Sequence, residues 1–212
     1  MTDPNLTHIE FVLDRSGSMM SIKEDIEGGF NAYIADQQTQ PGRCTVSLSQ
    51  FDDVYEPVFT ALDVKAVQQL TLMPRGSTAL LDAVGRSITA LGERLAALPE
   101  DDRPSRVIFA IMTDGMENAS KEFTHAAIKE MITHQEKTYD WAFLYMGADQ
   151  DAIEVGASIG IRADRSLTYG RGRARAAYAA SSRLTSAFRA APAGVTPDGV
   201  GFDQQDRTAA KD

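Results

Sequence analysis

The sequence has few of the features that mark a disulfide-bonded, membrane-spanning or nucleic-acid-binding protein. Cys44 is the only cysteine among 212 residues, so neither an internal disulfide nor a CxxC zinc or redox site can form. The longest apolar run near the middle of the chain, residues 107–112, is far shorter than the ~20 residues that a membrane-spanning helix needs. Lysine and arginine number 21 against 30 acidic residues, a formal charge of −9, which disfavours binding to nucleic acid through overall positive charge.

The start of the chain also lacks a basic segment followed by an apolar stretch. No secretory signal is visible, and we therefore expect a cytoplasmic protein. A phosphate-binding loop of the form Gly-x-x-x-x-Gly-Lys-Ser/Thr is missing as well, which disfavours a nucleotide-hydrolysing enzyme. The three histidines are His8, His125 and His134, and none lies in a segment with an evident catalytic partner. We expect all three at the surface.

The sequence does contain an alternation of apolar strands and amphipathic helices. Residues 107–112 (VIFAIM) are apolar on both alternating faces, as in a central parallel strand covered by helices on both sides. Residues 45–60 predict a hairpin, and Pro57, which has no N–H to donate, places its second arm at the edge of the sheet. The pattern predicts further strands at residues 9–13, 141–146 and 166–169, and helices at residues 21–38, 78–98, 123–134 and 174–190.

This order of elements predicts an α/β fold over residues 1–190. We expect an open, mostly parallel sheet with helices on both faces and one antiparallel edge strand. Residues 191–212 mix proline, glycine and charge with few apolar side chains, so we expect a disordered tail there. Gly28 and Gly29 lie inside a predicted helix and lower its propensity, which indicates close packing against a neighbouring element.

Polar loops follow two of the predicted strands and precede one of the helices. Their side chains carry the hard oxygen donors that Mg²⁺ or Mn²⁺ accepts. Ligands of an open α/β sheet bind at the carboxyl ends of its strands, so we expect these side chains to lie on one rim. Taken singly, each has a plainer interpretation as a helix cap or a turn former. The candidates are Asp14, Ser16, Ser18, Ser77, Thr78, Thr113 and Asp114.

Together these segments resemble the metal-ion-dependent adhesion site of von Willebrand factor type A (vWA) domains. FVLDRSGSM is similar to the Asp-x-Ser-x-Ser motif of that family, GSTAL matches its threonine at Thr78, and MTDG matches its aspartate at Asp114. The resemblance covers about residues 7–170 and implies the Rossmann-like vWA fold.

The resemblance also implies how such a site would work. The hydroxyls of Ser16, Ser18 and Thr78 would bind Mg²⁺ or Mn²⁺ directly, whereas Asp14 and Asp114 would act largely through coordinated water. A coordination position near the three hydroxyls would stay open for a Glu or Asp of a partner protein. The implied function is recognition without catalysis, by an adaptor in an intracellular complex.

Two other interpretations stay open. A Mg²⁺-dependent hydrolase or phosphatase could use the same Asp/Ser cluster, although a haloacid-dehalogenase-type phosphatase would need an aspartate where Ser16 stands. Residues 162–191 carry seven arginines against the single Asp164. That segment is either a surface for a second acidic partner or nucleic acid or, as we prefer, a solvated helix face paired with the acidic body.

Two smaller expectations concern acids near the same rim. Asp149 and Asp151 are expected to cap a short helix rather than to bind a second cation. Glu117, just beyond Asp114, is expected at the surface rather than at the ion.

Overall fold

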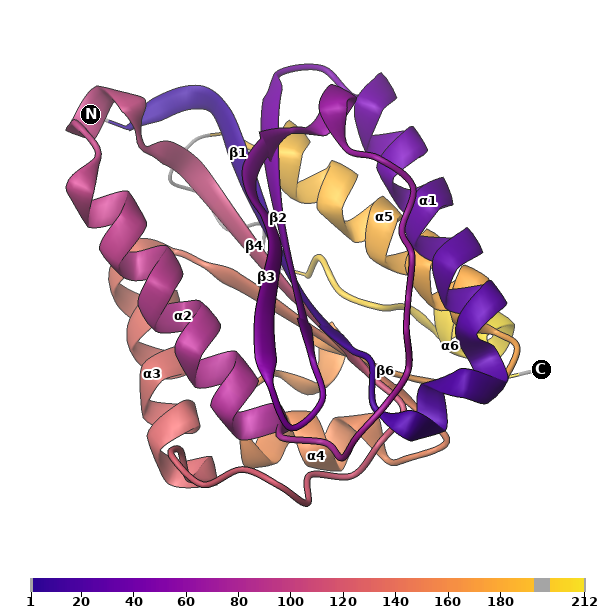
Figure 1. Ribbon diagram of the computed structural model, residues 1–212. Coiled ribbons are helices and arrows are strands. Elements are labelled where there is room, and N and C mark those ends of the chain that lie inside the picture. The colour runs from indigo at the N-terminus through magenta and orange to yellow at the C-terminus, as the bar shows by residue number, and fades with distance from the viewer. Residues whose placement is uncertain (1, 193–198, 212) are drawn as a thin grey trace.

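Six strands form one sheet in the computed structural model, which describes residues 2–192 and 199–211 (Figure 1). The strands are β1 (Asp3–Asp14), β2 (Arg43–Phe51), β3 (Tyr55–Asp63), β4 (Pro104–Thr113), β5 (Ala142–Ala148) and β6 (Ser166–Tyr169). Their order across the sheet is β3-β2-β1-β4-β5-β6. All neighbours run parallel except β2 and β3. The predicted mostly parallel sheet with one antiparallel edge strand is therefore confirmed.

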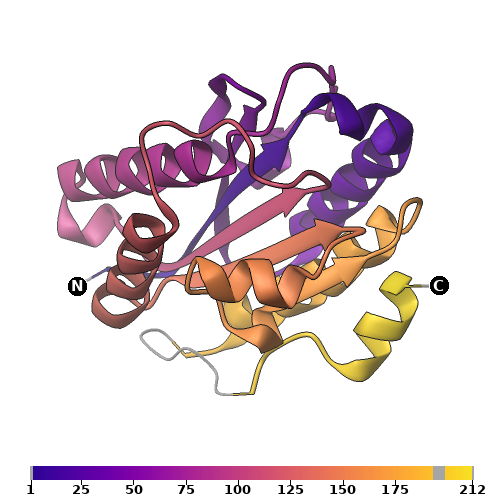
Figure 2. The same cartoon turned by 90° about the horizontal axis from the view of Figure 1, so that it is seen from below.

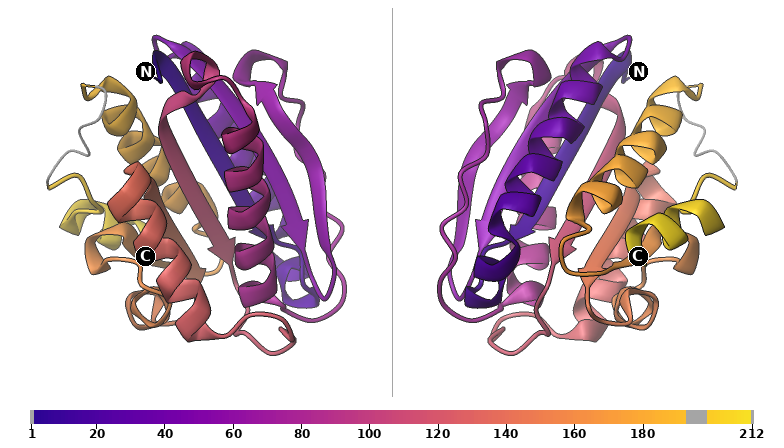
Figure 3. Two further views of the ribbon diagram at one scale, coloured as in Figure 1. Left: turned by 90° about the vertical axis from the view of Figure 1, so that its left-hand side faces the viewer. Right: turned by 90° about the vertical axis from the view of Figure 1, so that its right-hand side faces the viewer.

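Helices cover both faces of this sheet, as Figure 3 shows from opposite sides. They are α1 (Lys23–Thr39), α2 (Leu80–Ala97), α3 (His125–Tyr139), α4 (Ala152–Ser158), α5 (Ala174–Ala190) and α6 (Gln204–Lys211), and a short 3₁₀ helix, η1 (Gly17–Ile22), follows β1. One buried apolar cluster joins α1 and α5 to the sheet, and a second joins α2, α3 and α4 to its other face. Among the described residues, no helix is both long and apolar enough to cross a bilayer.

Strand β1 divides its side chains between these two layers because successive residues of a strand point to opposite faces. Ile9 and Phe11 pack in the cluster with α1 and α5. His8 and Glu10 lie on the opposite face, where Ser87 of α2 donates a hydrogen bond to Glu10. Asp14 lies on that same face, because alternate residues of a strand point to one side. The strand therefore carries polar side chains along its α2 face.

The expectation of three surface histidines is wrong for His8. Its side chain is 1% exposed, with Nδ1 2.9 Å from Thr45 Oγ1 and Nε2 3.1 Å from Glu10 Oε2. These partners satisfy the ring nitrogens inside the sheet layer, so burial leaves no polar atom of the ring without a contact. His125 and His134 are exposed, as expected.

The paired glycines of α1 confirm the close packing that the sequence indicated. A Cβ built on Gly29 would lie 2.4 Å from Tyr178 Cδ2, and one on Gly28 would lie 2.7 Å from Arg175 Nη2. Helix α5 therefore lies against α1 at a distance that only glycine permits. Tyr178 then completes an aromatic cluster with Phe11, whose ring centroid is 6.4 Å away.

The expected disordered tail is corrected for residues 199–211. Helix α6 packs beside β6, with Ala210 fully buried and Phe202 4% exposed. Gly170 N donates to Ala210 O at 2.8 Å, and Phe202 N donates to Asp164 O at 2.6 Å. Two apolar side chains and main-chain hydrogen bonds are thus enough to hold a segment whose composition is polar. Residues 193–198 and 212 of the expected tail lie outside the described residues.

Candidate metal centre

Strands β1 and β4 are parallel neighbours, and both end at the edge of the sheet seen from below in Figure 2. Leu13 is paired with Met112, so the last residues of the two strands, Asp14 and Thr113, lie side by side. Thr113 Oγ1 donates a hydrogen bond to Asp14 Oδ2 at 2.5 Å. The parallel pairing therefore fixes one oxygen of a carboxylate that is fully buried.

The loop after β1 turns back over Asp14 and reaches the loop after β4. Ser16 N donates to Asp14 Oδ1 at 2.6 Å. The hydroxyls of Ser16 and Ser18 are 3.0 Å apart, and Ser18 Oγ donates to Asp114 Oδ1 at 2.6 Å. A continuous chain of polar contacts thus joins four of the predicted ligands. The first and the last of them, Asp14 and Asp114, are 100 residues apart in the sequence.

Thr78, the fifth predicted ligand, is brought in by the loop that precedes α2. It is 3% exposed, and its backbone is held from both sides: Thr78 N donates to Asn118 Oδ1 at 3.0 Å, and Asn118 N donates to Thr78 O at 3.0 Å. A Cβ built on Gly115 would lie 2.6 Å from Thr78 Oγ1 and 3.4 Å from Asp14 Oδ2. The Thr78 hydroxyl and the Asp14 carboxylate therefore face the same small space, which only glycine at position 115 leaves open.

Two acidic side chains at this site, Asp14 and Asp114, have raised pKa values. Burial raises the pKa of Asp14 to about 6, although hydrogen bonds from Thr113 and Ser16 lower it. Burial also raises the pKa of Asp114, against the hydrogen bond from Ser18 and the positive charge of Arg171. Among the described residues, no basic side chain forms an ion pair with either carboxylate. Two acids held close together without an ion-paired basic side chain favour binding of a cation from outside.

Asp52, a buried acid in the neighbouring loop, shows the opposite arrangement. Its Oδ2 accepts from Arg15 Nε at 3.0 Å and from Arg75 Nε at 2.8 Å. Burial raises the pKa of Asp52, but the hydrogen bonds from Arg75, Val54 N and Arg15 outweigh it and leave the pKa below its usual value. Burial in this protein therefore does not by itself leave a carboxylate unpaired, since Asp52 has two arginine partners.

The residues present fit a divalent cation with hard oxygen ligands. Asp114 Oδ2 is buried and has no hydrogen-bond partner among the described residues, although a buried carboxylate oxygen normally has one. No cluster of three or more His, Cys, Asp and Glu side chains that could hold a metal occurs in the described part of the chain. The donor set is instead two carboxylates and three hydroxyls, which suits Mg²⁺ or Mn²⁺ better than a softer metal.

No family model matches the sequence, and no curated protein matches it significantly. Solved structures match the fold. The vWF domain of the type V pili tip protein Mfa5 from Porphyromonas gingivalis superposes with a TM-score of 0.62 at 10% identity, over 92% of this chain and 99% of that one. A von Willebrand factor type A structure from Catenulispora acidiphila gives 0.57 at 13% identity, over 87% and 43%. The protein has the von Willebrand factor type A fold.

Another structure with this vWA fold is proximal thread matrix protein 1 from the mussel byssus. It superposes with a TM-score of 0.63 at 14% identity, over 88% of this chain and 48% of that one. A further structure of the same mussel protein, with a TM-score of 0.54 at 17% identity over 79% and 42%, has a zinc-occupied MIDAS motif, the metal-ion-dependent adhesion site. The present chain spans about half the length of the mussel protein. At these identities the likeness establishes the fold alone.

Within this vWA fold, the loop after β4 is fastened to the start of α2 by two acids whose roles the sequence analysis missed. Glu117 Oε2 accepts from Leu81 N at 3.0 Å, and Asp82 accepts from three successive backbone N–H groups of residues 121–123. Glu117, expected at the surface, is half-buried: its carboxylate accepts from the N–H of Leu81, a helix donor that has no partner within α2. The only signal for this role was the polar composition of the loop.

Of the other predicted residues, Ser77 is exposed and Asp151 caps α4. Ser77 precedes Thr78 in the sequence. Among the described residues, it forms no hydrogen bond with the other candidate ligands. Asp151 Oδ1 accepts from Ile153 N and Glu154 N at 3.1 and 3.0 Å, which is the predicted N-cap. Asp149 instead pairs with Arg171 at 2.6 Å.

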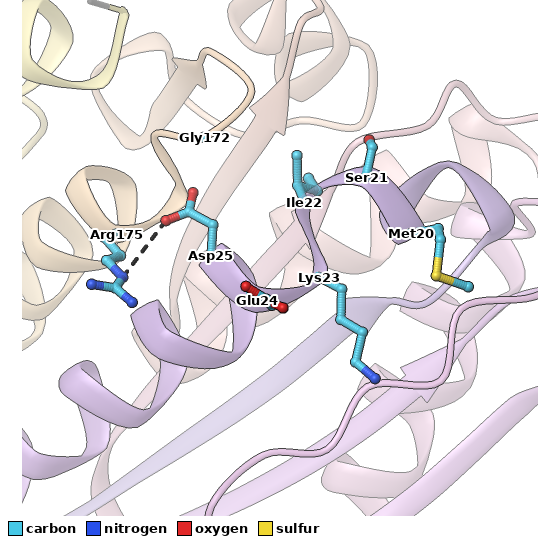
Figure 4. Close-up of a pocket in the computed structure, with 8 residues that line it drawn as sticks. All are labelled: Met20, Ser21, Ile22, Lys23, Glu24, Asp25, Gly172 and Arg175. Atoms are coloured by element: carbon cyan, nitrogen blue, oxygen red, sulfur yellow. Dashed lines mark ion pairs between the residues drawn. The ribbon is translucent and has the colours of Figure 1, made fainter.

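The arginine-bearing segment is paired with neighbouring acids. Arg171 contacts Asp149 as described, and Arg175 Nε lies 3.8 Å from Asp25 of α1, an ion pair drawn in Figure 4. Arg183 pairs with Asp206 of α6. These contacts support the preferred interpretation of a helix face paired with the acidic body.

Proposed function

We propose that the protein is a divalent-metal-dependent interaction module that binds an acidic residue of a partner protein. Ser16, Ser18 and Thr78 would hold Mg²⁺ or Mn²⁺ through their hydroxyls, and Asp14 and Asp114 would balance its charge. The observation that carries the proposal is that the buried carboxylate of Asp14 and the half-buried carboxylate of Asp114 are joined through Ser16 and Ser18 and form no ion pair among the described residues.

The carboxylates and the hydroxyls of this site would have different roles. The carboxylates of Asp14 and Asp114 provide negative charge, but hydrogen bonds from Thr113, Ser16 N and Ser18 already occupy three of their four oxygens. The hydroxyl ligands are neutral and leave most of a cation's charge available. When bound, a divalent ion supplies an electrophilic position that the carboxylate of a partner's Glu or Asp can fill.

The zinc-occupied MIDAS motif of the mussel protein supports a metal at this place in the fold. Our choice of Mg²⁺ or Mn²⁺ rests on the oxygen-only donor set. The adaptor role in a cytoplasmic complex is also part of the proposal. It agrees with the single thiol, Cys44, which is buried and whose pKa burial raises to about 11, so that it is a poor nucleophile.

A hydrolase using the same cluster is the alternative, and the geometry of Asp14 argues against it. Both of its carboxylate oxygens accept short hydrogen bonds, from Ser16 N and from Thr113, which hold the carboxylate in place and reduce its nucleophilicity. A Gly-x-Ser-x-Gly pattern occurs at residues 156–160. Ser158, however, is exposed at the end of α4 and donates to Val155 O at 2.7 Å, rather than lying on a strand-to-helix turn.

Titration calorimetry with Mg²⁺ and Mn²⁺ tests the proposal. Asp14→Ala is expected to weaken metal binding by more than about 100-fold, because it removes one of two charges that balance the cation. Asp53→Asn is the matched control, since it removes one charge from an exposed residue of the neighbouring loop and should leave the affinity unchanged. Equal affinity of Asp14→Ala and the wild type would reject the ligand assignment, and metal-dependent turnover of a phosphate ester that Asp14→Ala abolishes would favour the hydrolase.

A further inference from the structure

The three most exposed large apolar side chains of the described chain are all methionines. Met116 is 76% exposed, Met73 is 71% exposed and Met20 is 61% exposed. By contrast, Met19, Met112 and Met146 are completely buried. A single exposed apolar residue is ordinary, so what matters is where these three lie.

Two of them flank predicted metal ligands in the sequence. Met20 follows Ser18 by two residues in η1, and Met116 follows Asp114 by two residues in the loop after β4. Two residues of extended chain span at most about 7 Å, so both methionines lie at the candidate centre. Figure 4 places Met20 on the part of η1 away from Arg175, so that ion pair does not cover it.

The third methionine reaches the same rim through backbone contacts. Arg75 N donates to Arg15 O at 2.8 Å, and Gly17 N donates to Gly76 O at 3.2 Å. These bonds tie the loop before α2 to the loop that carries Ser16 and Ser18, and Met73 is two residues before Arg75.

Val54 adds a fourth apolar side chain from the turn between β2 and β3. It is 51% exposed, and the adjacent Asp52 O accepts from Ala79 N at 2.9 Å, which puts the turn beside Thr78. We call Met20, Val54, Met73 and Met116 the apolar collar. Its four members come from four separate segments, each fastened to a loop of the candidate centre.

Two arginines next to the collar are already paired with acids. Arg75 pairs with Asp52 at 2.8 Å, and Arg171 pairs with Asp149 at 2.6 Å. A partner rich in acidic residues would have to compete with these internal acids for the arginines. A single acid at the metal, surrounded by apolar side chains, would meet both the charge at the centre and the uncharged collar.

We propose that the collar and the metal centre form one docking surface for a partner segment in which a Glu or Asp is flanked by large apolar side chains. This inference rests on the proposed function. The acid fills the position at the metal, and the flanking side chains pack on the methionines, whose unbranched thioethers adapt to varied apolar shapes.

The test uses the full chain labelled with ¹³C at the methionine methyl groups, in Mg²⁺, and three synthetic peptides. The sequences are Ser-Leu-Leu-Glu-Leu-Leu-Ser, the same peptide with Gln for Glu, and Ser-Ser-Ser-Glu-Ser-Ser-Ser. The leucine–glutamate peptide is expected to shift the methyl signals of Met20, Met73 and Met116 and to bind at least about tenfold more tightly than either other peptide. The methyl signals of the buried Met19, Met112 and Met146 serve as internal references.

A variant separates the collar from the metal. Met20→Gln, Met73→Gln and Met116→Gln together should keep the Mg²⁺ affinity and weaken the leucine–glutamate peptide about tenfold. Tyr139→Gln is the matched control, because Tyr139 is 58% exposed at the end of α3, far along the chain from the collar loops, and should change neither affinity.

The outcomes distinguish the two proposals. If both glutamate peptides bind equally in Mg²⁺ and the collar methyls do not move, the collar inference fails while the metal-dependent recognition of an acid stands. If Ser-Ser-Ser-Glu-Ser-Ser-Ser binds more tightly than the leucine–glutamate peptide, the inferred partner chemistry is wrong. If metal binds but the glutamate and glutamine peptides are indistinguishable, the proposed function itself is overturned.

Discussion

Glu10 and Asp14 lie four residues apart on the same face of β1, and the chain treats their buried carboxylates differently. Glu10 accepts from Ser87 at 3.1 Å, and its Oε2 lies 3.1 Å from His8 Nε2 and 3.5 Å from Arg94 Nη2. Among the described residues, Asp14 receives hydrogen bonds from Thr113 and Ser16 alone. One acid therefore has a basic side chain beside it, and the other has a second acid, Asp114, close by.

The difference teaches that solvent exclusion alone does not define the candidate centre. Both acids are at most 4% exposed, so both have lost their hydration. A buried charge is stable only when paired, and the chain pairs Glu10 with Arg94 of α2. Asp14 has no ion-pair partner among the described residues, and we propose that a metal ion takes that place. The stability of a Glu10 variant should accordingly be independent of metal, whereas the effect of an Asp14 variant should change sign when metal is added.

Replacing Glu10 should give the largest loss of stability. Glu10→Gln leaves Arg94, whose side chain is 24% exposed, without its countercharge, and we expect a loss of about 2 kcal/mol after allowance for solvent screening. Urea unfolding should show the same loss with Mg²⁺ and with a chelator. Glu122→Gln, which breaks the exposed pair with Arg86, is the control and should change stability little. A Glu10 variant as mild as this control would mean that the buried pair contributes no more than a surface one.

Asp14 should behave in the reverse manner. With a chelator present, Asp14→Asn is expected to stabilise the protein by about 1–2 kcal/mol, because the raised pKa of Asp14 means that its ionised form opposes folding at neutral pH. With millimolar Mg²⁺ the wild type should become the more stable protein, since metal binds only its folded state. Thermal unfolding under the two conditions measures both signs. Destabilisation by Asp14→Asn in chelator would show that Thr113 and Ser16 already satisfy the carboxylate.

Local patterns in the sequence were enough for most of the fold. Residues 107–112 and 141–146 are apolar on both faces, and they form β4 and β5 in the middle of the sheet. The helix predicted over residues 78–98 is α2. Pro57 does lie on the antiparallel edge strand. In each case the signal is carried by side chains within one element, so no knowledge of distant partners is needed.

Less of the candidate site than of the fold could be predicted from local sequence patterns. Asp14, Ser16 and Ser18 share one loop, so their spacing suggested a common target. The predicted sheet placed Thr78 and Asp114 on the same rim, but only the resemblance to vWA domains assigned all five residues to one metal ion. The structure brings all five together. Their role as metal ligands stays a prediction.

What the sequence left hidden depends on contacts between distant segments. The alternation of His8 and Glu10 with Ile9 and Phe11 places the two polar residues on one face, but nothing in that pattern identifies Arg94, 84 residues beyond Glu10, as their partner. Similarly, the polar composition of residues 199–211 gave no indication that β6 and α5 would leave a place for Phe202 and Ala210.

Asn118 offers the smallest of the expected effects and tests how the distant segments are joined. Its Oδ1 accepts from Thr78 N, so Asn118→Ala leaves that donor without its partner, while the backbone of residues 118 and 119 still binds Thr78 O. We expect Mg²⁺ affinity to fall by about three- to tenfold, the equivalent of one hydrogen bond. The contacts of Glu10 with His8 and Arg94 should not change. Asn118→Asp keeps the acceptor and should restore most of the affinity. If Asn118→Ala binds Mg²⁺ as tightly as the wild type, the position of the Thr78 hydroxyl does not depend on this bond, and the loop after β4 contributes to the centre through Asp114 alone.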